Sequence, residues 1–171
     1  MNQIASIAMG TNMAYRGVSG GALLSQALSA IEQAGVAVTA RSSVWQTAAW
    51  PPGADQADYY NAVITAEAGA HTPRSLYDLL RGIEIDFGRE RRERWASRTL
   101  DLDLVAMGDL AGVFDGIELP HPRMQERAFV LAPLAEVDPG WRHPLLGRTA
   151  AQLLPDLPQE QGYRPIERGW G

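Results

Sequence analysis

Two aspartates one residue apart are the residues of this chain best suited to chemistry. Asp101 and Asp103 alternate with leucines in the run RTLDLDL, over residues 98–104. Strict alternation is typical of a strand with one buried face, and side chains at i and i+2 then point the same way, about 7 Å apart. Two carboxylates held side by side on a strand suit Mg²⁺, which prefers oxygen ligands.

An arginine-rich segment directly precedes the aspartates. Residues 88–98 read GRERRERWASR, which places five arginines within eleven residues. Taken alone, the strand is most often one-sided with its polar face in water, and the arginine run is usually a solvated helix end. Their adjacency favours a site, because the two carboxylates would repel each other unless a cation lay between them. Paired carboxylates for a metal beside guanidinium groups are the components of a phosphoryl-transfer site.

The composition restricts how the chain could handle phosphates. All fifteen basic residues are arginine, so a Walker A loop, a protein-kinase strand lysine and a Schiff-base lysine are excluded. The absence of cysteine excludes disulfides, a thiolate nucleophile and cysteine-bound zinc. Arginine, Mg²⁺ and backbone amides remain as possible phosphate ligands.

Charge and hydropathy indicate where the protein acts. The net charge of −5 argues against general nucleic-acid binding. No apolar run approaches the roughly 20 residues of a membrane span, and the first residues lack the features of a signal peptide. We therefore expect a cytoplasmic protein with no membrane and no nucleic-acid partner.

Three further residues could recognise a flat heterocycle. Asn61 lies at a strand start among apolar neighbours, where a turn or capping role is the more common one. An inward amide could instead read the polar edge of a ring, with a donor and an acceptor side by side. Tyr59 and Phe129 could stack such a ring on either side, although each is more often part of a core.

Other residues have both a structural and a functional interpretation. Glu84 is either an exposed helical glutamate or a hydrogen-bond partner for a ribose or base. Trp95 within the arginine-rich segment either packs against the core or closes over a ligand as part of a lid. His121 has a proline on each side, which restricts its backbone. A lone histidine is usually structural, but this one shares a segment with Arg123 and Arg127, so it could instead contact an anion.

Hydrophobic spacing predicts the elements that position these residues. A helix should begin at Pro73, with Thr72 as its N-cap, and extend to residue 87. We further expect a second helix at 22–34, strands at 4–9, 36–47, 59–67 and 100–107, a hairpin partner at 113–117, a buried helix at 129–137 and a helical turn near 149–154.

The order of these elements is strand, helix, strand, strand, helix, strand. It predicts an α+β protein with a ferredoxin-like βαββαβ core, an antiparallel sheet with helices packed on it and long mobile loops. The length of 171 residues is most simply one domain, residues 1–171.

At this point the motifs resemble those of a known family, hydroxymethyldihydropterin pyrophosphokinase. The resemblance covers about residues 4–138 and leaves 139–171 as a C-terminal extension. It is carried by RTLDLD at 98–103, LPHPRM at 119–124, RAFVL at 127–131, GTNM at 10–13, YYNA at 59–62 and IE at 83–84 followed by GR at 88–89.

The resemblance implies transfer of pyrophosphate from ATP to the hydroxymethyl oxygen of 6-hydroxymethyl-7,8-dihydropterin, which gives AMP and the pterin diphosphate in tetrahydrofolate biosynthesis. Asp101 and Asp103 would bind two Mg²⁺ ions, and Asp103 would help to take up the proton. Arg98 would contact ATP, and Arg89 would reach the phosphates or the product as its loop closes.

The resemblance also implies two sets of binding residues in a monomer whose partners are ATP and a reduced pterin. The pterin would contact Thr47, Tyr59, Asn61 and Phe129. ATP would contact Glu84, Arg91, Trp95, Arg98, Leu104, His121 and Arg127. The loops at 11–19, 48–58 and 88–98 would act as lids that exclude water.

Two alternatives remain open at this stage. The loops at 48–51 and 96–97 depart from the family pattern, so the chain could be a relative that binds ATP and pterin but has impaired turnover. A ferredoxin-like RNA-binding module shares the strand order, but such modules carry aromatic residues where this chain carries Asp101 and Asp103.

Overall fold

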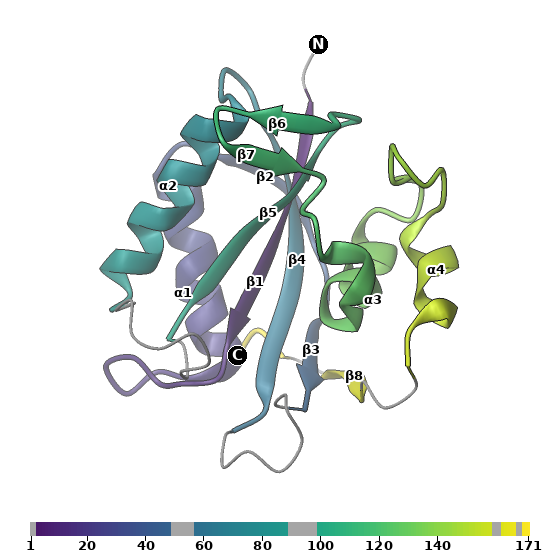
Figure 1. Ribbon diagram of the computed structural model, residues 1–171. Coiled ribbons are helices and arrows are strands. Elements are labelled where there is room, and N and C mark those ends of the chain that lie inside the picture. Colours follow the sequence, from purple (N-terminus) through teal and green to yellow (C-terminus); the bar gives the residue numbers. More distant parts are fainter. Residues whose placement is uncertain (1–2, 49–56, 89–98, 159–161, 167–168) are drawn as a thin grey trace.

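The computed structural model describes residues 3–171 except 49–56, 89–98, 159–161 and 167–168. A six-stranded sheet in the order β5-β1-β4-β3-β8, with β2 also paired to β4, has helices on both faces (Figure 1). The elements are β1 Ile4–Thr11, α1 Gly20–Gln33, β2 Ala37–Arg41, β3 Val44–Thr47, β4 Tyr59–Glu67, α2 Pro73–Asp86, β5 Asp101–Met107, β6 Gly112–Phe114, β7 Ile117–Leu119, α3 Ala128–Val137, α4 Ala150–Leu153 and β8 Tyr163–Ile166.

The predicted fold is confirmed. The pairs β1–β4, β1–β5, β2–β4 and β3–β4 are all antiparallel, and α1 and α2 pack on one face of the sheet as the βαββαβ order requires (Figure 1). Helix α3 lies on the opposite face, with α4 beside it. None of the helices in the described part of the chain is long and apolar enough to cross a membrane.

Each face of the sheet has its own hydrophobic core. Ile7, Ile64 and Leu102 pack with α1 and α2, whereas Val63 and Val105 pack with α3. This division follows the alternation of side chains along the strands. The leucines of the LDLDL run lie on one buried face of the strand, as predicted, and the structure shows that this face packs on α1 and α2. The aspartates between them face the α3 side.

The start of α2 shows why local sequence predicted it well. The Thr72 side chain accepts a hydrogen bond from the backbone N–H of Ser75, and the Ser75 hydroxyl accepts one from the N–H of Thr72. With Pro73 in the first turn, this capping arrangement satisfies backbone groups that a helix start leaves without partners.

The prediction of one strand over residues 36–47 was wrong, because β2 and β3 are separate strands. At the break, Ser42 N–H donates to the carbonyl of Val63, and Val63 N–H donates to the Ser42 side-chain oxygen. The serine hydroxyl thus replaces a backbone carbonyl in the ladder with β4 and lets the chain bend.

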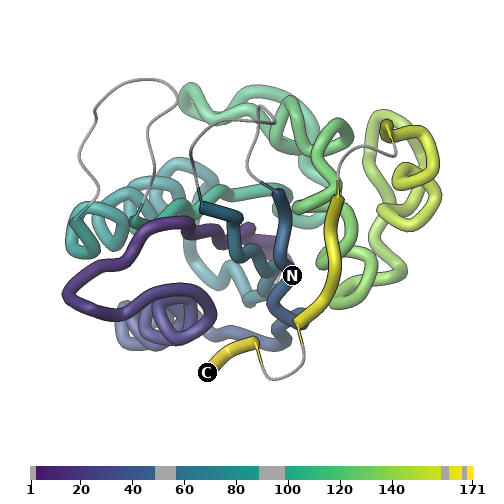
Figure 2. Tube along the Cα trace, turned by 90° about the horizontal axis from the view of Figure 1, so that it is seen from below, coloured from purple at the N-terminus to yellow at the C-terminus, as the bar shows by residue number. Residues whose placement is uncertain are grey.

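The strand β8 was not predicted. It pairs antiparallel with β3 at the edge of the sheet, and Figure 2 shows it (yellow) running along β3. An edge position tolerates Pro165, which has no N–H to contribute to a ladder. The C-terminal extension therefore belongs to the main sheet.

Candidate active site

Asp101, Gly10 and Asn61 form a row across three adjacent strands. Gly10 pairs with Asp101 of β5 on one side and with Asn61 of β4 on the other. Paired residues in adjacent strands share a face, so the three positions face the α3 side together. With strands about 4.8 Å apart, the first and last positions of the row are separated by about 10 Å.

Gly10 makes room for the Asn61 amide. A Cβ atom at Gly10 would lie 2.8 Å from the Asn61 Oδ1 atom, closer than a carbon and an oxygen can pack. Glycine in the GTNM motif therefore leaves the centre of the row open.

Asn61 is an inward amide, and the turn or capping interpretation was wrong. The residue is buried within β4, and its Nδ2 donates a 2.8 Å hydrogen bond to Oγ1 of Thr47 on β3. Tyr59, two residues earlier on the same strand, is paired with Thr47 and is half-buried. The structure thus brings three of the four predicted pterin residues together on β3 and β4.

The fourth predicted pterin residue, Phe129, lies in the first turn of α3 and is half-buried. The Arg127 guanidinium is 5.5 Å from the centre of its ring. This pair places an aromatic surface and a cation at the end of α3, the helix on the aspartate side of the sheet.

Asp103 is surrounded by charge of both signs. Its Oδ1 is 3.4 Å from Nη2 of Arg81, and its Oδ2 is 4.0 Å from Nη1 of Arg127. Burial and the neighbouring Asp101 raise the pKa of Asp103, while His121 and both arginines act in the opposite direction. Burial is the larger of the two raising effects, so the ionised form of Asp103 is disfavoured where it lies and an additional cation there would stabilise it.

The chemistry of the two aspartates fits Mg²⁺. Within the described ranges, no three His, Asp or Glu side chains form a group that could enclose a metal ion. Mg²⁺ is commonly held by one or two carboxylates, and it takes its remaining ligands from water and substrate phosphates. Asp101 and Asp103 would be those carboxylates.

His121 lies two residues after the end of β7, near Asp103 and Asp101. Its backbone N–H donates to the carbonyl of Val105 at 2.7 Å, and its Nδ1 accepts from the N–H of Arg123 at 3.2 Å. Burial lowers the pKa of His121, and the nearby Asp103 opposes this change. A neutral ring with Nδ1 occupied presents Nε2–H as a donor, consistent with an anion contact.

Glu84 is buried, so its interpretation as an exposed helical glutamate was wrong. Its Oε1 accepts from the backbone N–H of Leu102 at 2.7 Å, and its Oε2 accepts from Nη1 of Arg81 at 2.8 Å. The carboxylate therefore fastens α2 to the residue between the two aspartates. A contact with a nucleotide stays a prediction.

Arg81 belongs to the site and was missed by sequence reasoning. Its guanidinium bonds to Glu84, to the Leu102 carbonyl and to Asp103, and lies 4.7 Å from the centre of the Tyr77 ring. A signal existed, because Arg81 precedes Glu84 by three residues on the inward side of α2.

The side chain of Leu104 is directed away from the aspartates and lies in the α1–α2 core. Leu102 turns both its N–H and its carbonyl to the outer edge of β5, toward Glu84 and Arg81. Any contact of Leu104 with ATP would use its backbone.

Four predicted site residues lie outside the described part of the chain, namely Arg89, Arg91, Trp95 and Arg98. Their roles stay predictions from the resemblance.

Comparisons with known proteins identify the family. The profile of the 7,8-dihydro-6-hydroxymethylpterin-pyrophosphokinase (HPPK) family matches residues 6–139. The 2-amino-4-hydroxy-6-hydroxymethyldihydropteridine pyrophosphokinase of Bacillus subtilis is 40% identical over 139 residues, which are 80% of this chain and 79% of that protein. The enzyme of the same name from Synechocystis is 44% identical over 121 residues, 71% of this chain and 60% of that protein.

Solved structures agree with the fold. The HPPK-DHPS protein of Plasmodium falciparum superimposes with a TM-score of 0.70 over 91% of this chain and 45% of that one, at 12% identity. The chain thus spans less than half of that protein and about 60% of the Synechocystis enzyme. Because the family profile covers most of the chain, the chain belongs to the 7,8-dihydro-6-hydroxymethylpterin-pyrophosphokinase family.

Proposed function

We propose that this chain transfers pyrophosphate from ATP to 6-hydroxymethyl-7,8-dihydropterin, giving AMP and the pterin diphosphate for tetrahydrofolate synthesis. The observation that carries the proposal is the row Asp101, Gly10 and Asn61 on one face of the sheet. It combines a carboxylate suited to a metal with an amide suited to a heterocycle, separated by a residue without a side chain.

Asn61 would orient the pterin. Its Oδ1 faces the space over Gly10, while its Nδ2 is held by Thr47. An amide fixed in this way presents one defined edge to the ring. Tyr59 and Phe129, both half-buried, would supply the aromatic faces for stacking.

Two arginines and the N–H donor of His121, all near Asp103, would bind the triphosphate. Arg127 and His121 come from the segment that follows β7, and Arg81 comes from α2. Guanidinium groups suit phosphate oxygens because their N–H donors form a planar fork. The predicted contacts of Glu84, Leu104, Arg89, Arg91, Trp95 and Arg98 with ATP are part of the same proposal.

The reaction forms a bond between the hydroxymethyl oxygen and the β-phosphorus and breaks the bond from the β-phosphorus to the oxygen of AMP. The hydroxymethyl group loses its proton. Two Mg²⁺ ions, when bound by Asp101 and Asp103, would neutralise phosphate charge and increase the acidity of the hydroxyl. Asp103, within 4.0 Å of the guanidinium groups of Arg81 and Arg127, would help to take up that proton.

We propose that the protein acts as a monomer. The net charge of −5 and the packing of α3 on Val63 and Val105 argue against an RNA-binding module, which stacks bases on an open sheet face.

Product analysis tests the proposed function. Purified protein is incubated with ATP, Mg²⁺ and hydroxymethyldihydropterin, and AMP is separated from ADP by chromatography. Pterin-dependent AMP is the expected product. ADP would indicate transfer of a single phosphoryl group, and tight binding of both substrates without product would favour the relative with impaired turnover.

A further inference from the structure

The C-terminal strand completes the pairing of the strand that carries Thr47. On its inner side, β3 pairs with β4 only from Trp45 to Thr47. On its outer side, β8 pairs with the full length of β3, from Val44–Ile166 to Thr47–Tyr163. Without β8, β3 would be a four-residue strand at the sheet edge and weakly held, so pairing with β8 supplies much of the order of β3.

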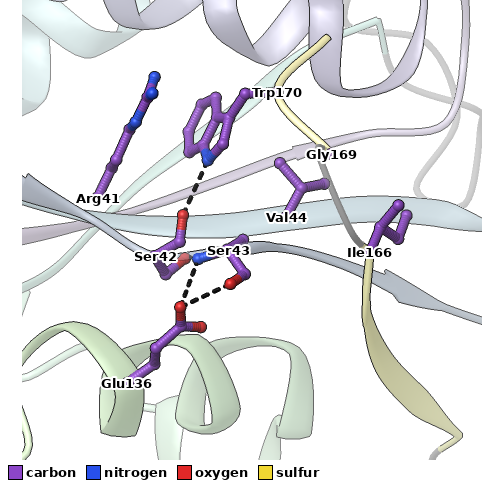
Figure 3. A pocket seen from close by; sticks show the side chains of 8 residues that line it. All are labelled: Arg41, Ser42, Ser43, Val44, Glu136, Ile166, Gly169 and Trp170. Atoms are coloured by element: carbon purple, nitrogen blue, oxygen red, sulfur yellow. Dashed lines mark hydrogen bonds between the residues drawn. The ribbon is translucent and has the colours of Figure 1, made fainter.

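Trp170 holds the start of β3 from the face of the sheet that α1 covers (Figure 3). Its indole Nε1–H donates a 2.8 Å hydrogen bond to the carbonyl of Ser42, in the break between β2 and β3. The Arg41 guanidinium lies 5.1 Å from the centre of the indole ring. The side chain thus combines a directional bond with a cation–π contact.

Glu136 of α3 holds the same break from the opposite face (Figure 3). Its Oε1 accepts from the backbone N–H of Ser43 at 2.8 Å and from the Ser43 hydroxyl at 2.7 Å. Its Oε2 accepts from the indole N–H of Trp45 at 3.0 Å. The break between the strands is therefore held from both faces, by α3 and by the C-terminal residues.

The C-terminal backbone packs directly on α1 and on β3. A Cβ atom at Gly21 of α1 would lie 1.3 Å from the carbonyl oxygen of Gly169. A Cβ atom at Gly169 would lie 2.6 Å from Cβ of Val44. The backbone at Gly169 is thus in close contact with α1 on one side and with β3 on the other, which leaves no room for a side chain at Gly21 or Gly169. These contacts closely define the position of the C-terminal residues.

We propose that β8 and residues 169–171 form a clamp that positions β3 for pterin recognition, with Trp170 as its positioning residue. The inference rests on the proposed function, because β3 carries Thr47 and Thr47 holds the amide of Asn61. The contacts that fix the backbone at Ser42 therefore also restrict Thr47, at the other end of the short strand β3, and through it the amide of Asn61. The segment beyond the family match thereby contributes to substrate affinity without contacting substrate.

Two pairs of variants test the clamp. Trp170→Ala removes the indole, whereas Trp170→Phe keeps a ring over Arg41 and removes only the N–H donor. Gly21→Ala displaces the tail without removing an atom. Gly82→Ala is its control, because a Cβ at this α2 position meets nothing within 4 Å.

Steady-state kinetics and hydrogen exchange provide the readouts. The clamp predicts that Trp170→Ala and Gly21→Ala raise the KM for the pterin roughly tenfold while kcat and the KM for ATP stay within about twofold. Backbone amides of β3 should exchange faster in both variants, Trp170→Phe should be milder than Trp170→Ala, and Gly82→Ala should match the wild type.

An unchanged pterin KM in folded Trp170→Ala would overturn the proposal. The proposal would also be overturned if the KM for the pterin and the KM for ATP rose equally and the whole protein lost stability. Such a result would indicate a structural role only. If the wild type shows no turnover, the proposed function is wrong, but the clamp can still be tested. Its readouts are then the hydrogen-exchange rates of the β3 amides and the Kd for the pterin from fluorescence titration.

Discussion

Glu84 on α2 accepts a 2.7 Å hydrogen bond from the backbone N–H of Leu102, the residue between the two aspartates of β5. The same carboxylate binds Arg81, whose guanidinium reaches Asp103. The buried Glu84 thus fixes both the backbone between the two aspartates and the guanidinium of Arg81, which lies beside Asp103. The site is built on a helix–strand contact as well as on the strand itself.

Glu84→Ala should strongly destabilise the protein. It leaves the Leu102 N–H without this partner and removes the carboxylate that neutralises Arg81, and breaking a buried pair costs about 3 kcal/mol. The free energy of unfolding is measured in urea. The control is Asp78→Ala on the same helix, where the Arg74–Asp78 pair is 48% and 53% exposed and contributes at most about 1 kcal/mol. Equal losses in the two variants would contradict this role of Glu84.

Asp103→Asn should abolish most activity without unfolding the protein. The pKa of Asp103 is raised by burial and by Asp101, so the charged form is disfavoured in the folded state and its removal should leave stability unchanged or increased at pH 7. The expected loss in kcat is at least about a hundredfold. Activity is compared with thermal unfolding on the same preparation, and a folded variant with wild-type turnover would refute the metal assignment.

Gly10→Ala should impair pterin binding more than ATP binding. The new methyl group would lie 2.8 Å from Oδ1 of Asn61 and push the amide aside, at a cost of about 1–3 kcal/mol in stability. Adding Asn61→Ala removes the clash, so the double variant should lose less stability than the two single losses combined. Additive losses would show that Gly10 and Asn61 do not interact in this way. Gly140→Ala, where a Cβ meets nothing within 4 Å, controls for the loss of glycine.

His143 should make stability depend on pH. The residue is 5% exposed, and its Nδ1 accepts from the backbone N–H groups of Leu145 and Leu146. Burial lowers its pKa, so the unfolded chain takes up a proton first as the pH falls, and stability decreases below about pH 6.5 until the folded form is also protonated.

The His143 prediction is checked by urea unfolding of wild type and His143→Gln between pH 7.5 and pH 5. The stability difference between the two proteins should shrink toward acid pH, since only the wild type loses this contribution. Carboxylates titrate alike in both, so parallel curves would contradict the prediction.

Local patterns predicted most of the fold. Alternation over residues 59–67 gives β4 at its observed bounds, and Thr72 with Pro73 gives the start of α2. Features that depend on distant residues were missed. Residues 163–166 lack alternation and become a strand only through pairing with β3, more than a hundred residues earlier. The break at Ser42 likewise depends on Val63 of another strand.

Site residues that belong to a sequence motif could be predicted, whereas those whose role depends on packing between distant elements could not. LDLDL indicates the aspartates, and the family motifs add Asn61, His121 and Arg127. Burial of Glu84 and the part played by Arg81 arise from α2 packing against β5, which hydrophobic spacing does not distinguish from an exposed ion pair. The role of Trp170 depends on a contact with Ser42 across the sheet.

The most direct measurement follows the β-phosphorus of ATP labelled with ³²P at that position, in parallel reactions of wild type and Asp103→Asn. Pyrophosphoryl transfer at the aspartate pair predicts that the wild type moves the label to the pterin product and releases an equal amount of unlabelled AMP, while Asp103→Asn moves almost none. Label retained in ADP after pterin-dependent turnover, or equal transfer by the variant, would contradict pyrophosphoryl transfer at the aspartate pair.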